Sequence, residues 1–288
     1  MKSPRLMMSA SMAVFGTIGL LVRNISVSSG ELALYRALLA LAFLLAVTLM
    51  GRRSLVARLP RKEWALLLVS GAAMGFNWIL LFQAYRYTTV SVATLSYYFA
   101  PVLVTLACPL LFKEKMSARQ WLCFGMSTVG LVMITGVGDT AAGSNHLLGI
   151  AFGLGAAVLY ATVILLNKSI QGVQGLARTF WQFAAAAAVL VPYVAFTSGI
   201  TLATMDAGGW ACLLTVGLLH TGVTYCLYFS ALKELSGQQT ALLSYIDPLV
   251  AVAVSVTLLG ETLTVWQALG GALILGFTLW NELKATQR

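Results

Sequence analysis

Long apolar stretches alternate with short polar connections along the whole of this chain. Each stretch runs for about 20 residues with few charges, the length that a helix needs to cross the hydrocarbon core of a bilayer. Lipid offers no partner to an unpaired backbone group, so each stretch is predicted to be helical. The pattern predicts ten spans, over residues 6–25, 32–50, 64–85, 91–112, 119–137, 147–167, 177–198, 209–231, 238–259 and 264–281.

The composition agrees with this all-α integral membrane protein and excludes a soluble one. Of the 288 residues, 59% are hydrophobic and 9% are charged, whereas a soluble domain carries about 25% charged residues. Ten spans occupy about 200 residues, which leaves no room for a soluble catalytic or nucleic-acid-binding domain. The net charge of +9 lies in loops at span ends. We therefore predict a membrane-lipid environment and no nucleic-acid partner.

Basic residues gather in alternate loops and at both termini. With ten spans, all of the 18 Lys and Arg residues except Arg23, Arg36 and Arg86 lie on one side of the membrane. The positive-inside rule places that side in the cytoplasm. The sequence thus predicts a multi-pass protein of the cell inner membrane with both termini cytoplasmic. Interfacial anchors are predicted at the span ends that carry Trp64, Trp121, Trp210, Trp266 and Trp280.

Residues 82–120 recur in degraded form at residues 229–267. At a shift of 147 the matched pairs include Tyr98 and Tyr245, Pro101 and Pro248, and Glu114 and Glu261. Each half holds an odd number of predicted spans, so the later copy enters the membrane from the opposite side. We predict two inverted five-helix repeats, over residues 1–137 and 147–288. Such repeats are typical of alternating-access transporters, which hold the substrate near the midplane.

The core of this match is "LSYYFAPVLV" against "LLSYIDPLVA". In each copy the proline of the fourth span is followed by a glutamate just beyond the span. This pattern resembles the repeat of the EamA family in the drug/metabolite transporter superfamily, and the resemblance covers nearly the whole chain. It implies ten helices around a central cavity and export or uptake of small metabolites. It does not imply one substrate, because a fold is a poor guide to a ligand.

Asp247 lies near the middle of the ninth span, directly before Pro248. A charge at that depth costs at least about 2.5–3.5 kcal/mol, so it is expected to face a cavity or a partner. It could hold a substrate ammonium or exchange a proton. The alternative is a carboxyl that caps the backbone gap opened by Pro248, since proline removes a helix hydrogen bond.

Two basic side chains have comparable alternatives. His220, in the eighth span, could form a proton relay with Asp247 or help to hold a zwitterion. It could equally be hydrogen-bonded between packed helices. Arg36, about one turn into the second span, could bind a substrate carboxylate, reach the membrane interface, or pair with Glu31.

A polar residue followed by an aromatic one recurs in both halves. Asn77 and Trp78 match Thr224 and Tyr225 at the same shift of 147. This recurrence predicts a pseudo-symmetric cavity lined by spans three, four, eight and nine, although aromatic packing would give the same pattern. Ligand pockets need only a few polar groups among apolar ones. Further candidates on spans four and nine are Tyr97, Tyr98, Ser244 and Tyr245.

Other motifs point to structure rather than chemistry. Glu114 and Glu261 are predicted to bond backbone N–H groups near the start of the next helix. The four cysteines form no C-x-x-C pair, so we predict no metal site and no disulfide. The sequence contains no P-loop, zinc motif or nucleophile elbow. We therefore expect no cofactor and no enzymatic activity.

These features predict a secondary transporter of a small organic metabolite, with an amino acid or derivative and export favoured. Asp247 would hold the ammonium, Arg36 or Asn77 the carboxylate, and the aromatic residues the side chain. One alternative is a carrier of quaternary-ammonium compounds or cationic drugs, with a cation–π cage. An alternative of another class is a membrane-embedded lipid-modifying enzyme, which needs a catalytic cluster at interface depth. Proton coupling, and the choice between monomer and homodimer, stay open.

Overall fold

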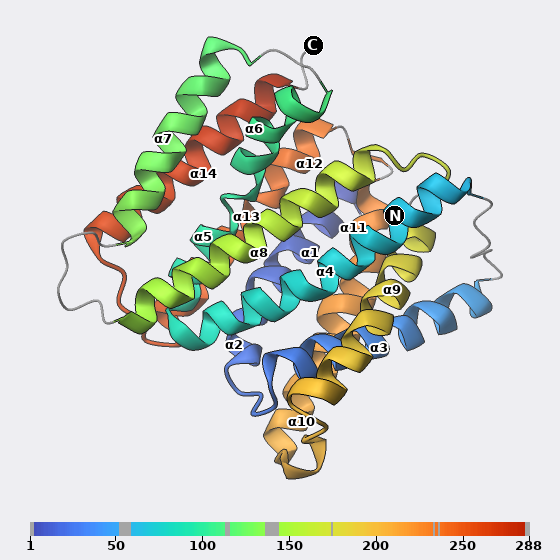
Figure 1. The fold of residues 1–288 in the computed structure, drawn as a ribbon. Helices are drawn as coiled ribbons and strands as arrows, with labels where there is room; N and C mark the ends of the chain where they lie inside the picture. The colour runs from blue at the N-terminus through green and yellow to red at the C-terminus, as the bar shows by residue number, and fades with distance from the viewer. Residues whose placement is uncertain are drawn as a thin grey trace.

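The computed structural model describes residues 3–51, 59–112, 116–135, 144–173, 175–232, 234–235 and 237–285. Within these ranges all regular secondary structure is helical (Figure 1). In chain order the helices are α1 Pro4–Gly16, α2 Ile18–Val22, α3 Ser29–Met50, α4 Arg61–Tyr87, α5 Val90–Tyr97, α6 Ala100–Phe112, α7 Ala118–Thr135, α8 Ser144–Lys168, α9 Gly175–Thr197, η1 Leu202–Thr204, α10 Ala207–Leu214, η2 Thr215–Val223, α11 Thr224–Leu232, α12 Gly237–Ser244, α13 Ile246–Thr257 and α14 Val265–Ala285.

Several of these helices are long and apolar enough to cross a bilayer, which makes this a multi-pass membrane protein. In the described ranges seven helical runs meet that requirement by length and composition. They are Pro4–Val22, Ser29–Met50, Arg61–Tyr87, Val90–Ala107, Asn145–Lys168, Gly175–Thr197 and Ala207–Leu232. The other three predicted spans correspond to α7, to α12 with α13, and to α14. Their passage through the membrane stays a prediction.

The fourth and ninth predicted spans are each two helices rather than one. α5 ends at Tyr97 and α6 begins at Ala100, while α12 ends at Ser244 and α13 begins at Ile246. Pro101 and Pro248 stand in the first turn of the second helix of each pair, where a missing N–H is tolerated. Each proline ring crowds the carbonyl four residues earlier, so the preceding helix cannot continue through it. The repeat therefore places a helix break at the same position in both halves.

The eighth predicted span contains a π-helical stretch, η2, between α10 and α11. Two hydroxyls bond carbonyls of this stretch five residues back, at 2.8 Å from Thr221 to Val216 and at 2.7 Å from Thr224, the first residue of α11, to Leu219. A Cβ added at Gly217 would lie 2.4 Å from a side-chain carbon of Leu39 in α3. The stretch therefore packs closely against α3. Such π turns are rare and are frequent at functional sites.

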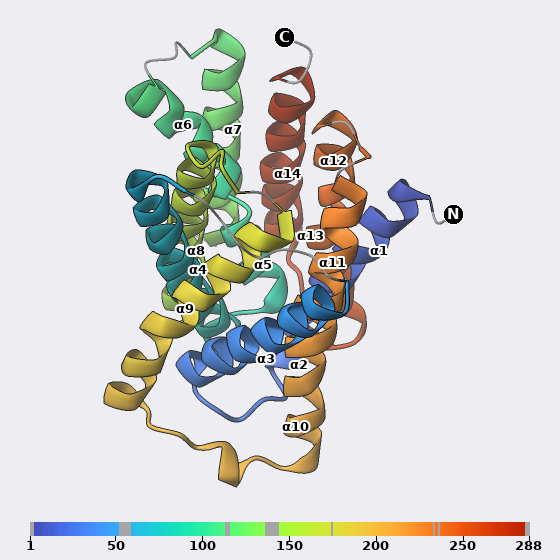
Figure 2. The same cartoon turned by 90° about the vertical axis from the view of Figure 1, so that its right-hand side faces the viewer.

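Many contacts between helices recur when each helix is replaced by its counterpart in the other half of the chain. α4 packs along α8 and α9, and the α11–η2 run packs along α1 and α3. α5 contacts α8 as its counterpart α12 contacts α1, and α6 contacts α8 as its counterpart α13 contacts α1. Two further contacts, α3 with α9 and α7 with α14, join equivalent helices; the last pair runs side by side in Figure 2. Exchanging each helix for its counterpart thus reproduces these contacts, whereas, among the described residues, the contact of α5 with α13 has no counterpart of similar extent between α6 and α12.

The helix contacts are close because small residues lie at them. A Cβ added at Gly71 of α4 would lie 2.4 Å from the carbonyl oxygen of Gln182 in α9. A Cβ at Gly149 of α8 would lie 2.7 Å from Thr88. Small residues spaced four apart allow helix backbones to approach in this way. A separate set of large apolar side chains lies on the outside, as Phe196 does at 89% exposure.

Candidate substrate-binding cavity

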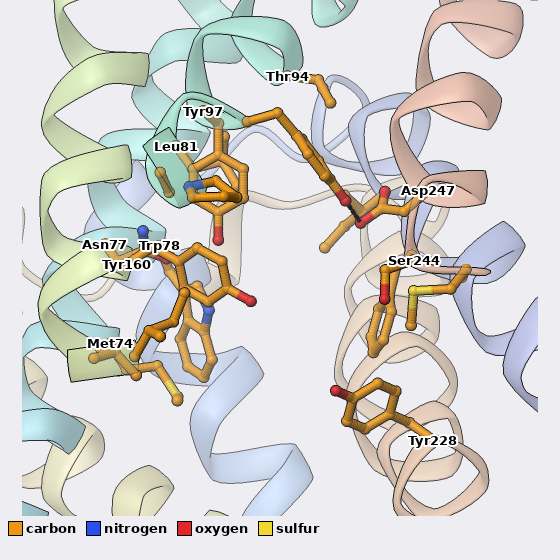
Figure 3. A pocket seen from close by; sticks show the side chains of 18 of the residues that line it. Met74, Asn77, Trp78, Leu81, Thr94, Tyr97, Tyr160, Tyr228, Ser244 and Asp247 are labelled. Atoms are coloured by element: carbon orange, nitrogen blue, oxygen red, sulfur yellow. Dashed lines mark hydrogen bonds between the residues drawn. The ribbon is translucent and has the colours of Figure 1, made fainter. Parts of the chain in front are cut away.

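A cavity of about 340 Å³ lies between the two halves of the chain, at the level of the helix breaks. Figure 3 shows its two walls, with Trp78, Tyr97 and Tyr160 on one side and Ser244 and Asp247 on the other. Backbone that leaves the helical pattern inside a membrane is tolerated where it lines such a cavity. The residues that the breaks contribute to the lining are Tyr97, Tyr98, Ala100, Pro101, Ser244, Tyr245 and Asp247.

Asp247 lies at the cavity and is held from the opposite half of the chain. The Tyr98 hydroxyl donates a hydrogen bond of 2.7 Å to its Oδ2 atom, drawn as a dashed line in Figure 3. This bond joins the break in the fourth span to the break in the ninth. Among the described residues, no backbone N–H donates to the Asp247 carboxylate. The carboxylate therefore faces the cavity and does not cap the gap beside Pro248.

Arg36 is buried at the same cavity, with 5% of its surface exposed. Its Nε donates a hydrogen bond of 2.8 Å to the Thr221 hydroxyl in η2. Its Cζ lies 4.5 Å from the ring centroid of Trp78 and 5.7 Å from that of Phe82. Such placement over aromatic faces is a cation–π arrangement. No ion pair joins Arg36 to a carboxylate within the described part of the chain.

The two structural alternatives for Arg36 are both wrong. The side chain does not reach the interface, because it is buried. Glu31 is used elsewhere: it accepts hydrogen bonds of 2.6 Å from the backbone N–H and from the hydroxyl of Thr201. Glu31 also forms a reciprocal capping box with Ser28 at the start of α3. The cap fixes the helix start earlier than the hydropathy pattern indicates, so Arg36 lies about two turns into the helix.

Aromatic rings make up much of the remaining lining. The four residues that the sequence predicted to lie near a central opening, Trp78, Tyr98, Tyr225 and Tyr245, all line it. Tyr97 packs on Tyr160 of α8 with ring centroids 5.2 Å apart. These rings provide a surface on which an apolar or aromatic ligand group can pack.

Two predicted site residues, His220 and Thr224, do not line the cavity, and a third, Asn77, lines it with its amide bonded to a neighbouring helix. His220 places Nε2 2.9 Å from the Thr17 hydroxyl, and it does not line the cavity with Asp247. The predicted relay between these two residues is therefore wrong. The Thr224 hydroxyl bonds within its own helix. Asn77 borders the cavity, but its amide donates a hydrogen bond of 2.6 Å to the carbonyl of Ala156.

Other lining residues were not anticipated from the sequence. Tyr85 and Thr94 place their hydroxyls 3.5 Å apart at the cavity. Phe15 and Tyr160 line it from the first helix of each half. These last two match at a shift of 145 in the sequence. That weak repeat signal could have identified them as a symmetric pair.

The cavity continues toward one end of the molecule. A second cavity, of about 810 Å³, shares Met74, Tyr160 and Tyr225 with the first. It extends along α8 and α9 to Asn167 and Arg178. We call this the Arg178 end. The central cavity is thus accessible from the side where α8 ends and α9 begins.

Polar contacts join the two halves of the chain at the opposite end, which we call the Glu261 end. Arg23 Nη2 lies 2.7 Å from Glu261 Oε1, and the same nitrogen donates a hydrogen bond of 2.7 Å to the Thr88 carbonyl. Glu261 Oε2 accepts a hydrogen bond of 2.8 Å from the Val90 backbone N–H at the start of α5. Glu261 therefore bonds a helix start, but in the other half of the chain rather than in the helix that follows it. Glu114 lies outside the described residues.

The groups around the cavity are suited to bind a small molecule. One carboxylate, one guanidinium, several hydroxyls and a set of rings surround the cavity. Among the described residues, no group of three or more His, Cys, Asp or Glu side chains could hold a metal ion.

Comparison with known proteins gives consistent results. The model of the EamA-like transporter family matches twice, at residues 3–136 and 147–281. The chain is 29% identical over 268 residues to the uncharacterized transporter YxxF of Bacillus subtilis, covering 93% of this chain and 85% of that protein. It is 30% identical over 203 residues to an uncharacterized transporter of Archaeoglobus fulgidus, covering 69% and 70%. A crystal structure with 18% identity superposes with a TM-score of 0.67 over 99% of this chain and 98% of that one, which shows a shared fold.

Proposed function

Because the chain belongs to the EamA-like transporter family, we propose that this membrane transporter carries an amino acid or a close derivative by alternating access. The observation that supports this substrate is the presence of Asp247 and Arg36 at one cavity without an ion pair between them. A buried charge is costly unless it is paired. A zwitterionic ligand supplies a partner to each of them, with its ammonium at Asp247 and its carboxylate at Arg36.

The size and lining of the cavity fit the same class of substrate. Small-molecule sites are typically about 300–1,000 Å³ and mostly apolar, with a few polar groups that fix orientation. The central cavity has a volume of about 340 Å³. In this proposal Tyr97 and Tyr225 contact the side chain of the substrate, and the hydroxyl of Tyr98 positions the Asp247 carboxylate.

Alternating access follows from an inverted repeat, which we propose for residues 1–137 and 147–288. The exchange-matched helix contacts and the two matches to one family model support it. The distribution of basic residues favours a cytoplasmic Arg178 end and cytoplasmic termini. The open cavity then corresponds to an inward-open state, which suits loading from the cytoplasm and export. Exchange of a proton at Asp247 is the proposed coupling.

The cationic-drug alternative is less well supported by this geometry. The face of Trp78, the strongest cation–π partner among the side chains, already lies 4.5 Å from the Arg36 guanidinium. A second cation there would meet a like charge. For a lipid-modifying enzyme, the separation of His220 from Asp247 removes the acid–base pair that such chemistry would use.

Uptake into proteoliposomes tests the substrate class. The probes are an aromatic amino acid, its amide without the carboxylate, its deaminated acid, and a quaternary ammonium compound, each with and without a pH gradient. We expect saturable transport of the amino acid and much weaker transport of both truncated analogues. Transport of the quaternary ammonium compound without transport of amino acids would refute the proposal in favour of the cationic carrier.

A further inference from the structure

We infer that Arg23 and Glu261 form the closure that seals the Glu261 end of the cavity, and that this contact breaks and re-forms in every transport cycle. The inference rests on the alternating access proposed above. It concerns two residues that lie outside the cavity lining. Their role is to hold one end shut while the other is open.

The contact joins the two halves of the chain. Arg23 follows α2 in the first half, and Glu261 lies between α13 and α14 in the second. Beyond the 2.7 Å ion pair, Glu261 accepts from Val90 N–H at the start of α5 and from the Ser255 hydroxyl. A helix N-terminus favours a negative charge through its unpaired N–H groups. Glu261 therefore contacts residues at the end of α2, at the start of α5 and in α13.

The exposure of the pair suits a contact that opens. The Glu261 side chain is 8% exposed and that of Arg23 is 34% exposed. The arginine thus remains partly in water and can be rehydrated when the pair separates. An ion pair with one partner partly in water lies between an exposed pair, which contributes little to stability, and a fully buried pair, which is costly to break. A closure must be strong enough to bias two states and weak enough to release, and this pair meets both requirements.

Close backbone packing lies between the ion pair and the cavity. A Cβ added at Gly19 of α2 would lie 2.4 Å from a side-chain carbon of Val90. A Cβ added at Gly16 of α1 would lie 2.5 Å from the carbonyl oxygen of Asp247. A passage to this end therefore requires α1 and α2 to move away from α5 and α13. The ion pair spans the same separation, so opening must break it.

A neighbouring arginine provides a matched control. Arg86 also lies at the Glu261 end, where it donates a hydrogen bond to the Val27 carbonyl. This bond involves neither Glu261 nor any residue of the second half, so its loss leaves the Arg23–Glu261 ion pair in place. Arg86→Gln removes an arginine at the same end without touching the contact between the halves.

Accessibility of a cysteine in the cavity tests the inference without knowledge of the substrate. The four native cysteines are replaced, Thr94→Cys is introduced at the cavity, and an impermeant thiol reagent is added from each side of oriented vesicles. We expect the parent protein to be labelled mainly from the Arg178 side. Arg23→Gln and Glu261→Gln should each raise the rate of labelling from the Glu261 side by about tenfold, which corresponds to about 1.4 kcal/mol. Arg23→Lys should restore most of the closure, and Arg86→Gln should leave the rate unchanged.

The outcomes separate this inference from the proposed function. Labelling of the parent from one side only, with no change in the Arg23 and Glu261 variants, would overturn the closure alone. A parent labelled from neither side would contradict alternating access itself. If a single variant fails to fold, the pair Arg23→Cys with Glu261→Cys and a reducible bifunctional thiol reagent replaces it. Cross-linking should then stop transport and reduction should restore it; transport that continues while cross-linked refutes the closure.

Discussion

Replacing Asp247 with asparagine is expected to remove transport while leaving the protein folded. Asparagine keeps the shape of the side chain, and its carbonyl oxygen can still accept from the Tyr98 hydroxyl, now 2.7 Å from Oδ2 of Asp247. The substitution therefore removes the negative charge and little else. It tests charge rather than packing.

The structure gives a magnitude for each effect. A hydrogen bond to a charged group contributes about 1.5–3 kcal/mol and a neutral one about 0.5–1.5 kcal/mol, so Asp247→Asn should change stability by about 1 kcal/mol. Loss of one partner of a buried ammonium–carboxylate pair costs about 2–5 kcal/mol. Affinity for the substrate should therefore fall by at least about 30-fold. The effect on binding exceeds the effect on folding.

Uptake into proteoliposomes and thermal stability in detergent should be measured together for Asp247→Asn and Asp247→Ala. Alanine removes the hydrogen-bond acceptor of the Tyr98 hydroxyl. This loss lowers the free energy of unfolding by about 1–3 kcal/mol where water does not replace the bond. We expect both variants to lose transport and alanine to lose more stability. Full transport by the asparagine variant would refute the reasoning and leave Arg36 and the aromatic rings as the site.

Three further changes have clear expectations. Arg36→Gln should weaken binding of the amino acid but not of its amide, because only the former presents a carboxylate; equal losses for both ligands in a binding assay would argue against that role. Gly19→Ala should destabilise the closed Glu261 end, since its Cβ would lie 2.4 Å from Val90. Gly276→Ala, which meets no atom within 4 Å, is its control, and a reporter cysteine in the cavity measures both. Asn77→Leu should lower stability by about 0.5–1.5 kcal/mol because it removes a buried hydrogen bond to the Ala156 carbonyl, and an unchanged midpoint in a thermal melt would contradict this.

The sequence predicted much of the cavity because its positions recur in both halves. Trp78 and Tyr225, like Tyr98 and Tyr245, are counterparts in the repeat, and all four line the same space. Asp247 was identified by its depth alone, since a carboxylate in the middle of a span needs a cavity or a partner. These inferences depended on repetition and on the cost of burying charge, both of which can be read from the chain.

The errors have local physical causes. Hydropathy does not register the cap formed by Ser28 and Glu31, so the second span was started too late and Arg36 was placed too near the interface. The π-helical stretch depends on packing of Gly217 and Gly222 against α3, which is a tertiary feature. It changes the direction of side chains around His220, which therefore faces Thr17 rather than the cavity.

The breaks at Pro101 and Pro248 have a consequence for the electrical integrity of the membrane. Neither proline has an N–H to offer to the carbonyls of Tyr97 and Ser244, four residues earlier, and both breaks lie at the cavity. Such backbone inside a bilayer needs water or protein around it, and in the open cavity proposed above water meets that need in the absence of a substrate. When the centre holds water, only the sealed part of the protein separates the aqueous solutions on the two sides of the membrane. In the proposed inward-open state, the barrier between Asp247 and Glu261 would carry most of the transmembrane voltage, and a defect there would leak ions before it slowed transport.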